Sequence, residues 1–317
     1  MKLQHMVDRY VSYRQAMGDG FASAAKDLRC FARFIGPTAD LTAVRPKQVK
    51  LFLDGRRPGT RSWHVRYGDL SRFYRYVVSH GYLAKAPLPR VTPRRPPPFV
   101  PYIYSREELG RLLRGTDTYQ QRPNCLEPIT LRTLILLLYG AGLRLGEAVA
   151  LNRGDVDLTA AVITIRRTKF YKSRLVPFGT HLGQALVRYA ATRPGPVAQS
   201  PCHDVPFFTT RTDTRVKKYI IHRDFQRLRE HAGVRRSDSE RSQPRLHDLR
   251  HSFAVHRLTS WYRQGADVQK LLPYLSTYLG HASLRGTQVY LSMTPELLHE
   301  AAARFNHYVW KEERDEG

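Results

Sequence analysis

The sequence Leu246-His247-Asp248-Leu249-Arg250-His251-Ser252-Phe253-Ala254 decides how the C-terminal part of the chain folds. Its two leucines and its phenylalanine recur at helical spacing and mark the buried side of a helix. His247 and Arg250 lie one turn apart, and Pro244 with the polar run before it places both in the first turn. Free backbone N–H groups and the helix dipole favour a phosphate group at that end.

Two further motifs, one on each side of this helix, carry residues of related chemistry. Gly142-Leu143-Arg144-Leu145-Gly146-Glu147 stands earlier in the chain, and Glu147 lies one helical turn after Arg144, where its carboxylate can hold the guanidinium. After the helix come Leu279-Gly280-His281 and then Tyr290. The three motifs together place arginine, histidine and tyrosine in a fixed order.

Between the first two motifs the pattern changes from helix to strand. Val162-Ile163-Thr164-Ile165 and Leu175-Val176-Pro177-Phe178 are rich in β-branched and apolar residues. A polar connection, Lys169 to Arg174, separates them. We therefore predict a β-hairpin inside an otherwise helical domain.

Six residues in chain order resemble the catalytic set of the tyrosine recombinases, the phage integrase and Xer family. They are Arg144, Lys169, His247, Arg250, His281 and Tyr290. The resemblance implies a mainly α-helical fold with a small antiparallel β-sheet, made of an N-terminal helical core-binding (SAM-like) domain and a C-terminal tyrosine recombinase catalytic domain. It also implies an enzyme that breaks and rejoins double-stranded DNA through a 3′-phosphotyrosyl link, without a metal or any other cofactor.

Phosphoryl transfer explains the arginines and the tyrosine. Negative charge gathers on the nonbridging oxygens as phosphorus becomes five-coordinate, and Arg144 and Arg250 would supply permanent, bidentate positive charge there. The resemblance makes Tyr290 the nucleophile. A phenol is a poor nucleophile until a base or a positive field favours the phenolate, and we expect the two arginines and two histidines to provide that field.

The remaining residues of the set move protons. The resemblance assigns His247 to accept the proton of the tyrosine and His281 to donate to the scissile phosphate. The departing 5′ oxygen also needs a proton, which the resemblance assigns to Lys169. Lys172 is close by in the sequence and remains the alternative.

The composition indicates a polyanionic partner. Among 317 residues, 52 are Lys or Arg and 27 are Asp or Glu, which gives a formal net charge of +25. Such a surface raises the encounter rate with DNA or RNA, and a basic protein kept soluble by its charge is the alternative. The three cysteines, Cys30, Cys125 and Cys202, are far apart and odd in number, so we expect neither disulfides nor a zinc site, and a protein of the reducing cytoplasm. With DNA as its partner, we expect the protein to be associated with the nucleoid. We expect no signal peptide and no membrane segment.

We predict a helical domain at 1–88, a linker at 89–104 and a catalytic domain at 105–317. Apolar residues recur at helical spacing in 21–35 and in 63–77, as in a small helical bundle. The dense prolines of the linker cannot continue a helix and favour an extended segment.

Seven basic residues outside the catalytic set are candidate DNA contacts: Arg61, Arg72, Arg75, Arg94, Arg95, Lys172 and Arg174. The first three fall opposite the apolar stripe of 63–77 when residues are stepped at 100°, and an ordinary solvated face is the alternative. The two linker arginines suit a segment that crosses a phosphate backbone, with a disordered linker as the alternative. We expect the last two, in the polar connection, to contact phosphates.

Two features bear on the role within the family. The helical pattern begins almost at Met1, so we expect no additional arm-binding domain. The segment between Arg250 and Leu279 is longer than in compact Xer proteins and looks more like recombinases of transposons and integrative elements. We therefore expect integration or excision of a mobile element, with Xer-like resolution of chromosome or plasmid dimers as the alternative.

The family also implies partners. They are two DNA sites, a homotetramer that acts through a Holliday junction, and accessory directionality proteins. The helix expected from Pro295 to Tyr308 would dock on the neighbouring subunit. A type IB topoisomerase and a catalytically silent DNA-binding relative remain alternatives from other classes.

Lys169→Ala should cleave ordinary DNA slowly and recover on a substrate whose bridging 5′ oxygen is sulfur, because a thiolate leaves without a proton. Single-turnover cleavage of the two substrates measures this. Lys172→Ala is the matched control. Rescue of that variant, and not of Lys169→Ala, would transfer the role of general acid to Lys172.

Overall fold

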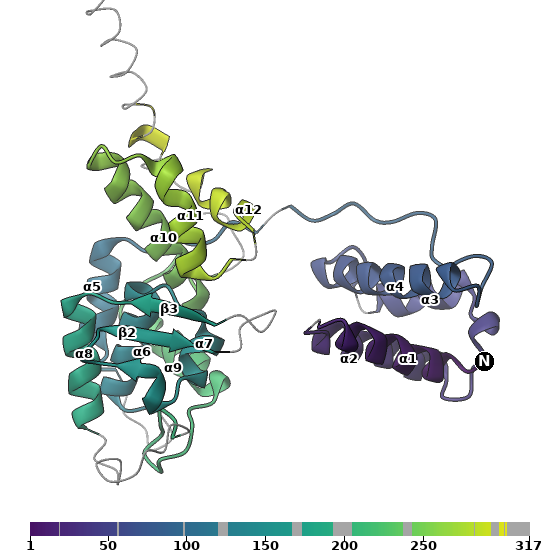
Figure 1. Cartoon of the computed structure of the whole chain (residues 1–317), viewed down its shortest axis with the longest axis horizontal. Coiled ribbons are helices and arrows are strands. Elements are labelled where there is room, and N and C mark those ends of the chain that lie inside the picture. The colour runs from purple at the N-terminus through teal and green to yellow at the C-terminus, as the bar shows by residue number, and fades with distance from the viewer. Residues whose placement is uncertain are drawn as a thin grey trace, which may run out of the picture. The chain divides into compact units, whose positions relative to one another are not determined.

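The computed structural model describes residues 1–18, 20–55, 57–97, 99–119, 126–166, 173–192, 205–236, 243–281, 283–292, 298–300 and 302. The chain forms two compact units, residues 1–99 and residues 100–317 (Figure 1). The boundary falls inside the linker expected at 89–104, of which the described residues before 100 form neither helix nor strand. Leu88 still packs against the core of the first unit.

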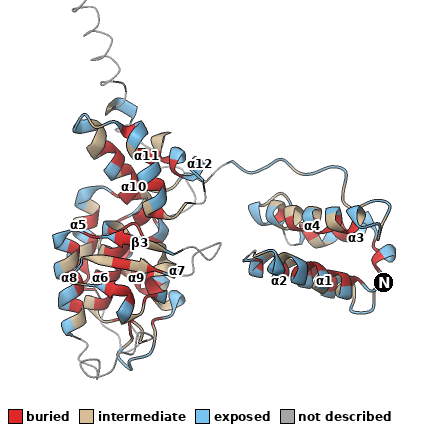
Figure 2. Cartoon of the chain, in the orientation of Figure 1, coloured by how far each residue is buried: buried red, intermediate tan, exposed pale blue. Residues whose placement is uncertain are grey.

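The first unit is a helical bundle. Its elements are α1 (Leu3–Ala16), α2 (Ala22–Ile35), the 3₁₀ helix η1 (Leu41–Ala43), α3 (Pro46–Asp54) and α4 (Arg61–Ser79). The predicted apolar stripes are buried, for example Leu28 and Phe31 of α2 and Phe73 of α4, and Figure 2 shows buried residues along these helices. Thr60 caps α4 by accepting a hydrogen bond from the backbone N–H of Trp63 (3.2 Å).

The second unit is mainly helical. Its helices are α5 (Arg106–Gly115), α6 (Pro128–Gly140), α7 (Leu145–Ala150), η2 (Arg153–Asp155), α8 (Thr180–Ala191), α9 (Lys218–His231), α10 (Leu246–Arg263), α11 (Val268–Leu279), α12 (Arg285–Gln288) and η5 (Val289–Ser292). The apolar helix α6 packs against α8 and α10 and forms the centre of the core. In the described part of the chain, no helix combines the length and apolarity needed to cross a membrane.

A small antiparallel sheet covers part of this core. Strands β1 (Val156–Asp157), β2 (Val162–Ile165) and β3 (Arg174–Pro177) pair in that order, with Ile163 opposite Val176. The predicted hairpin is confirmed, and β1 adds a third strand. Strand β3 begins one residue earlier than expected, so Arg174 belongs to the strand and lies opposite Ile165.

A second apolar cluster joins α10, α11 and η5. It includes Phe253, Leu279 and Tyr290. Gly142 meets this cluster just before α7, in a left-handed conformation with φ of +60°. A Cβ atom at Gly142 would lie 2.6 Å from the ring of Phe253 and 2.9 Å from Leu279. The glycine therefore lets the segment before α7 approach α10 and α11 closely.

Gly142→Ala should lower the free energy of unfolding by about 3 kcal/mol, since it combines left-handed strain with overpacking. Urea unfolding measures the change. Gly265→Ala is the matched control, because Gly265 also has positive φ (+69°), but a Cβ atom there would meet no other atom within 4 Å. The control substitution should cost only about 1 kcal/mol. Equal costs for the two variants would contradict the close packing at Gly142.

Candidate active site

Arg250 lies near the start of α10, as predicted, and is only 2% exposed. Its Nη1 donates to the carbonyl oxygen of Gly142 and its Nη2 to that of Leu279, both at 2.6 Å. Burial, followed by repulsion from Arg144, lowers the pKa of Arg250 to about 10, so the side chain stays charged at neutral pH. The end of α11 and the segment before α7 thus hold one fixed positive charge between them.

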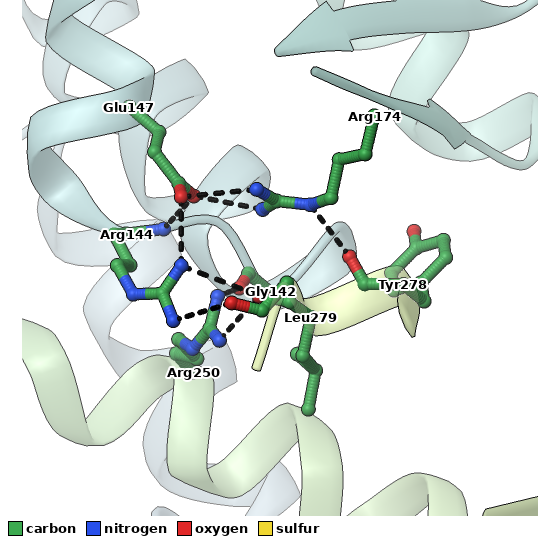
Figure 3. Close-up of polar contacts among 8 residues, drawn as sticks. Gly142, Arg144, Glu147, Arg174, Arg250, Tyr278 and Leu279 are labelled. Atoms are coloured by element: carbon green, nitrogen blue, oxygen red, sulfur yellow. Dashed lines mark hydrogen bonds and ion pairs between the residues drawn. The ribbon is translucent and has the colours of Figure 1, made fainter. Parts of the chain in front are cut away.

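Arg144 brings a second guanidinium to the same place. It directly precedes α7, and its Nη2 donates to the carbonyl oxygen of Gly280 (2.9 Å). Its Nη1 donates to Leu279 (3.4 Å), whose carbonyl oxygen also accepts from Arg250. Figure 3 shows the two arginines meeting at this turn. Arg144 and Arg250 are 106 positions apart in the sequence, and the fold brings them together, as expected for two residues of one catalytic set.

Glu147 holds Arg144 as expected, and it does more. Its Oε1 accepts from Nη1 of Arg144 (2.8 Å), and its Oε2 accepts from the backbone N–H of the same residue (3.0 Å). Burial would raise the pKa of Glu147, but the hydrogen bonds and charges of Arg174 and Arg144 outweigh it and lower the pKa to about 2. The carboxylate is therefore ionised across the physiological pH range.

Arg174 does not lie where we expected it. Instead of facing solvent for a phosphate contact, its side chain is 9% exposed and pairs with Glu147. Nη1 and Nη2 donate to the two carboxylate oxygens (3.0 and 2.8 Å), and Nε donates to the carbonyl oxygen of Tyr278 (2.9 Å). The reason is the strand period: Arg174 points to the same face of β3 as the buried Val176.

The aromatic side of the site is a row of four rings. His247 and His251 are one turn apart on α10, with ring centroids 4.8 Å apart and planes at 90°. The ring centroid of His251 lies 5.5 Å from that of Tyr290, and the ring of His281 stacks on Tyr290 at 6.0 Å. The structure thus brings the three predicted residues together and inserts His251, which the sequence analysis did not select.

The histidines are neutral at physiological pH. Burial, then the charge of Arg250, lowers the pKa of His247 and takes that of His281 to about 4. Burial, then His247, lowers the pKa of His251 to about 4. Nδ1 of His281 shares a 2.7 Å hydrogen bond with Oγ1 of the buried Thr287, a second residue that the sequence analysis missed.

Tyr290 is 3% exposed and sits in η5. Burial raises its pKa, although Arg250 and Arg144 act in the opposite direction. The positive field that we expected is therefore present, but it does not outweigh desolvation in this structure. The phenol is protonated at neutral pH, and a proton acceptor is needed for attack.

Several predicted residues lie outside the described residues. Lys169 and Lys172 are among them, as is most of the helix expected from Pro295 to Tyr308. Residues 298–300 and 302 are helical, and Glu300 pairs with Nε of Arg263 at 2.7 Å.

The candidate DNA contacts of the first unit are exposed. Arg61 and Arg75 lie on the polar side of α4, as the 100° stepping predicted, and so does Arg72, which pairs with the buried Asp69. Arg94 and Arg95 are exposed in the segment without helix or strand. Their exposure is compatible with phosphate contacts.

The positions of His251, which was missed, and of Arg174, which was assigned to the wrong surroundings, both had a signal in the sequence. His251 follows His247 by one helical turn, so the two had to share a face of α10. Arg174 precedes Val176 by two, the period of a strand, and only its assignment to the connection hid this. Thr287 had no such signal, because the segment between His281 and Tyr290 shows no clear period.

Among the described residues, His, Cys, Asp and Glu side chains form no group of three that could hold a metal ion. Two arginines that share one backbone carbonyl, beside a tyrosine in ring contact with two histidines, have the chemistry that phosphoryl transfer requires. On a basic, mainly helical fold, this chemistry points to the class of DNA strand-transfer enzymes.

Comparison with known proteins gives the family. Residues 105–296 match the phage integrase family. The chain is 38% identical to the integrase/recombinase y4rE of Sinorhizobium fredii over 95% of each chain. It is 30% identical to tyrosine recombinase XerC of Chlorobaculum parvum over 82% of this chain and 80% of the relative. The chain belongs to the phage integrase family and is a site-specific tyrosine recombinase.

Solved structures share the fold. The Tn1549 transposon integrase in complex with transposon right end DNA matches with a TM-score of 0.68 at 15% identity, covering 97% of this chain and 99% of that chain. A lambda integrase dimer bound to a COC' core site matches with a TM-score of 0.64 at 16% identity, covering 92% and 78%.

Glu147→Gln should lower the free energy of unfolding at pH 7 by about 3 kcal/mol, because it leaves the buried Arg174 without its counter-ion. Since the folded pKa lies below the ordinary value, this stabilisation is complete above about pH 5 and is lost as the pH falls towards 2. Urea unfolding of both proteins between pH 7 and pH 3 measures the difference.

Glu230→Gln is the control, because Glu230 is half exposed and pairs with Arg229 at 3.4 Å. It should change stability by less than about 1 kcal/mol. A cost for Glu147→Gln that stays constant down to pH 3 would contradict the ionised, buried carboxylate.

Proposed function

We propose that Tyr290 attacks a DNA phosphodiester and forms a 3′-phosphotyrosyl link with release of a 5′-hydroxyl. The observation that carries this assignment is the meeting of Arg144 and Arg250 at the Leu279 carbonyl, next to the ring row that contains Tyr290. A 5′-hydroxyl from the partner duplex then attacks the link and reverses the reaction. The phosphotyrosyl bond conserves the energy of the broken bond, so neither ATP nor another cofactor is needed.

The two arginines bind the scissile phosphate. Both are charged, and both are aimed by hydrogen bonds to rigid backbone, so little reorganisation is needed when charge develops on the nonbridging oxygens. Arg144 is 38% exposed at its side chain, which makes it the more accessible of the two to DNA. Arg250 is the inner support, with its position fixed by burial.

His281 donates a hydrogen bond to the scissile phosphate. A neutral imidazole has one N–H, and its hydrogen-bond partner selects which nitrogen carries it. If the hydroxyl of Thr287 donates to Nδ1, the proton of His281 resides on Nε2. That nitrogen then faces the phosphate as a donor without adding a full charge.

Proton transfer involves the other predicted residues. His247, which is neutral and lies in the first turn of α10, accepts the proton of Tyr290. Lys169 protonates the departing 5′ oxygen, with Lys172 as the alternative. Because Tyr290 is covered in this structure, η5 must shift when DNA binds, so that the phenol reaches the phosphorus.

We further propose that the chain integrates or excises a mobile element, as a homotetramer on two duplex sites that acts through a Holliday junction. Similarity to y4rE and the shared fold with the Tn1549 integrase support this role. In this assembly, the exposed arginines of the first unit bind phosphates outside the cleavage position. The C-terminal helix contacts a neighbouring subunit. Accessory directionality proteins select between integration and excision. The protein acts in the cytoplasm, on nucleoid DNA.

Xer-like resolution of chromosome or plasmid dimers is the second candidate, favoured by the similarity to XerC. The two roles differ in their DNA sites. Inverted repeats at the ends of an element that carries the gene support integration, whereas a single site in the replicon supports resolution.

Tyr290→Phe should bind DNA almost normally and form no covalent adduct, because it removes one hydroxyl and little packing. A suicide substrate nicked beside the cleavage position, followed by a denaturing gel, measures trapping. Tyr139→Phe is the control, since it removes a hydroxyl whose hydrogen-bond partner is His256 (2.9 Å) and not one of the proposed catalytic residues; it should still be trapped.

Trapping of Tyr290→Phe would identify another nucleophile. Absence of any adduct from the wild-type protein on a verified site would support a catalytically silent relative. Relaxation of supercoiled DNA that lacks a partner site would favour topoisomerase-like activity.

A further inference from the structure

All three nitrogens of the Arg174 guanidinium donate hydrogen bonds inside the protein. Nη1 and Nη2 form a bidentate pair with Glu147, and Nε donates to the carbonyl oxygen of Tyr278 (Figure 3). With its side chain 9% exposed, it has no free edge for DNA. A lysine at this position would supply the charge, but it has no planar fork to bind a carboxylate and a carbonyl together.

Arg174 also packs directly against the turn that precedes His281. Gly280 adopts a left-handed conformation with φ of +66°, and a Cβ atom there would lie 2.6 Å from Nη1 of Arg174. The carbonyl oxygen of Gly280 accepts from Arg144. The guanidinium of Arg174 is thus placed between Glu147 and the turn, the two groups that hold Arg144.

We infer that Arg174 is a positioning residue for Arg144, which it orients through Glu147 and through the 278–280 turn. The inference rests on the proposed function, in which Arg144 binds the scissile phosphate. It replaces the phosphate contact that the sequence had suggested for Arg174.

Electrostatics gives the direction of the effect. Glu147 divides its charge between two guanidiniums, Arg144 and Arg174. Without Arg174, the whole carboxylate charge acts on Arg144, pulls it towards α7 and competes with the phosphate for it. The loss should fall on the transition state, where charge on the phosphate is greatest, and much less on DNA affinity, to which many contacts contribute.

The position of Arg174 on β3 adds a second consequence. Strand β3 follows the connection that contains Lys169 and Lys172, and Arg174 is its first residue. The ion pair therefore anchors the base of the hairpin to α7 and to the end of α11. A single side chain links the segment of the proposed general acid with the arginine that binds the phosphate.

The test compares Arg174→Met and Arg174→Lys with the wild type on two suicide substrates, one with a phosphodiester and one with a neutral methylphosphonate at the cleavage position. Single-turnover cleavage at saturating protein is measured, together with Kd at several salt concentrations. On the phosphodiester, both variants should cleave about 100-fold more slowly, the loss typical of one misplaced charge donor. Their Kd and salt slope should stay close to wild type.

On the methylphosphonate the penalty should shrink to about 10-fold or less, because a neutral group depends less on Arg144. The double variant with Glu147→Gln should be no slower than the slower single variant, because one residue acts through the other. Arg215→Met is the matched control: Arg215 also donates to protein acceptors, among them Val149 (2.8 Å) and Asn152 (2.6 Å), but touches neither Arg144 nor Glu147. Its cleavage rate should stay near wild type on both substrates.

Three outcomes would overturn the inference. An equal penalty on the two substrates would show that Arg174 only stabilises the fold. A weaker Kd with a salt slope reduced by about one would show a direct phosphate contact. Full activity of Arg174→Lys would show that charge alone suffices at this position. Should Arg174→Met not fold, the conservative Arg174→Lys decides among these outcomes. Failure of the proposed function is distinguishable, because the wild type itself would then form no adduct.

Discussion

The end of helix α11 is the point on which the site depends. The last carbonyl groups of a helix have no intrahelical donor and carry the negative end of the helix dipole. Here the carbonyl oxygens of Tyr278, Leu279 and Gly280 accept hydrogen bonds from three arginines, one directly before α7, one on α10 and one on β3. Mutual repulsion would otherwise drive these guanidiniums apart, and the backbone acceptors together with Glu147 hold them within one small volume.

This arrangement explains why so much of the site is buried. Desolvation of a charge is costly unless hydrogen bonds replace water, and Arg250, Arg174 and Glu147 all have such bonds. The same burial keeps the histidines neutral and Tyr290 protonated. The structure therefore keeps its positive charges in place while its proposed nucleophile is covered. In the proposed function, exposure of Tyr290 by a shift of η5 would couple DNA binding to cleavage.

In the proposed function, DNA affinity and chemistry depend on different parts of the chain. The residues of the site all belong to the second unit, whereas the exposed arginines of α4 belong to the first. Phosphate contacts of exposed arginines position a protein on a duplex without reading its sequence. The high net positive charge suits this division, because it adds to encounter and binding wherever it lies.

Much of the fold follows from local patterns. The helical period of the first unit, the hairpin and the helix that carries Arg250 were all predictable, because each depends on residues within a few positions of one another. The identity and order of Arg144, His247, Arg250, His281 and Tyr290 also came from the sequence, through a motif that the family match supports. Their meeting in space follows the expectation from that motif.

The sequence by itself determined which residue types the site contains, since charge and hydrogen-bonding capacity are properties of the side chains. Only the tertiary structure decided that Arg174 and Arg250 are buried, and that the side chain of Arg144 is more exposed. Arg174 is buried because β3 packs against the end of α11, and Tyr290 has a raised pKa because α10 and α11 enclose it. Burial and the pairing of distant charges depend on how elements pack, and no local pattern in the chain encodes that.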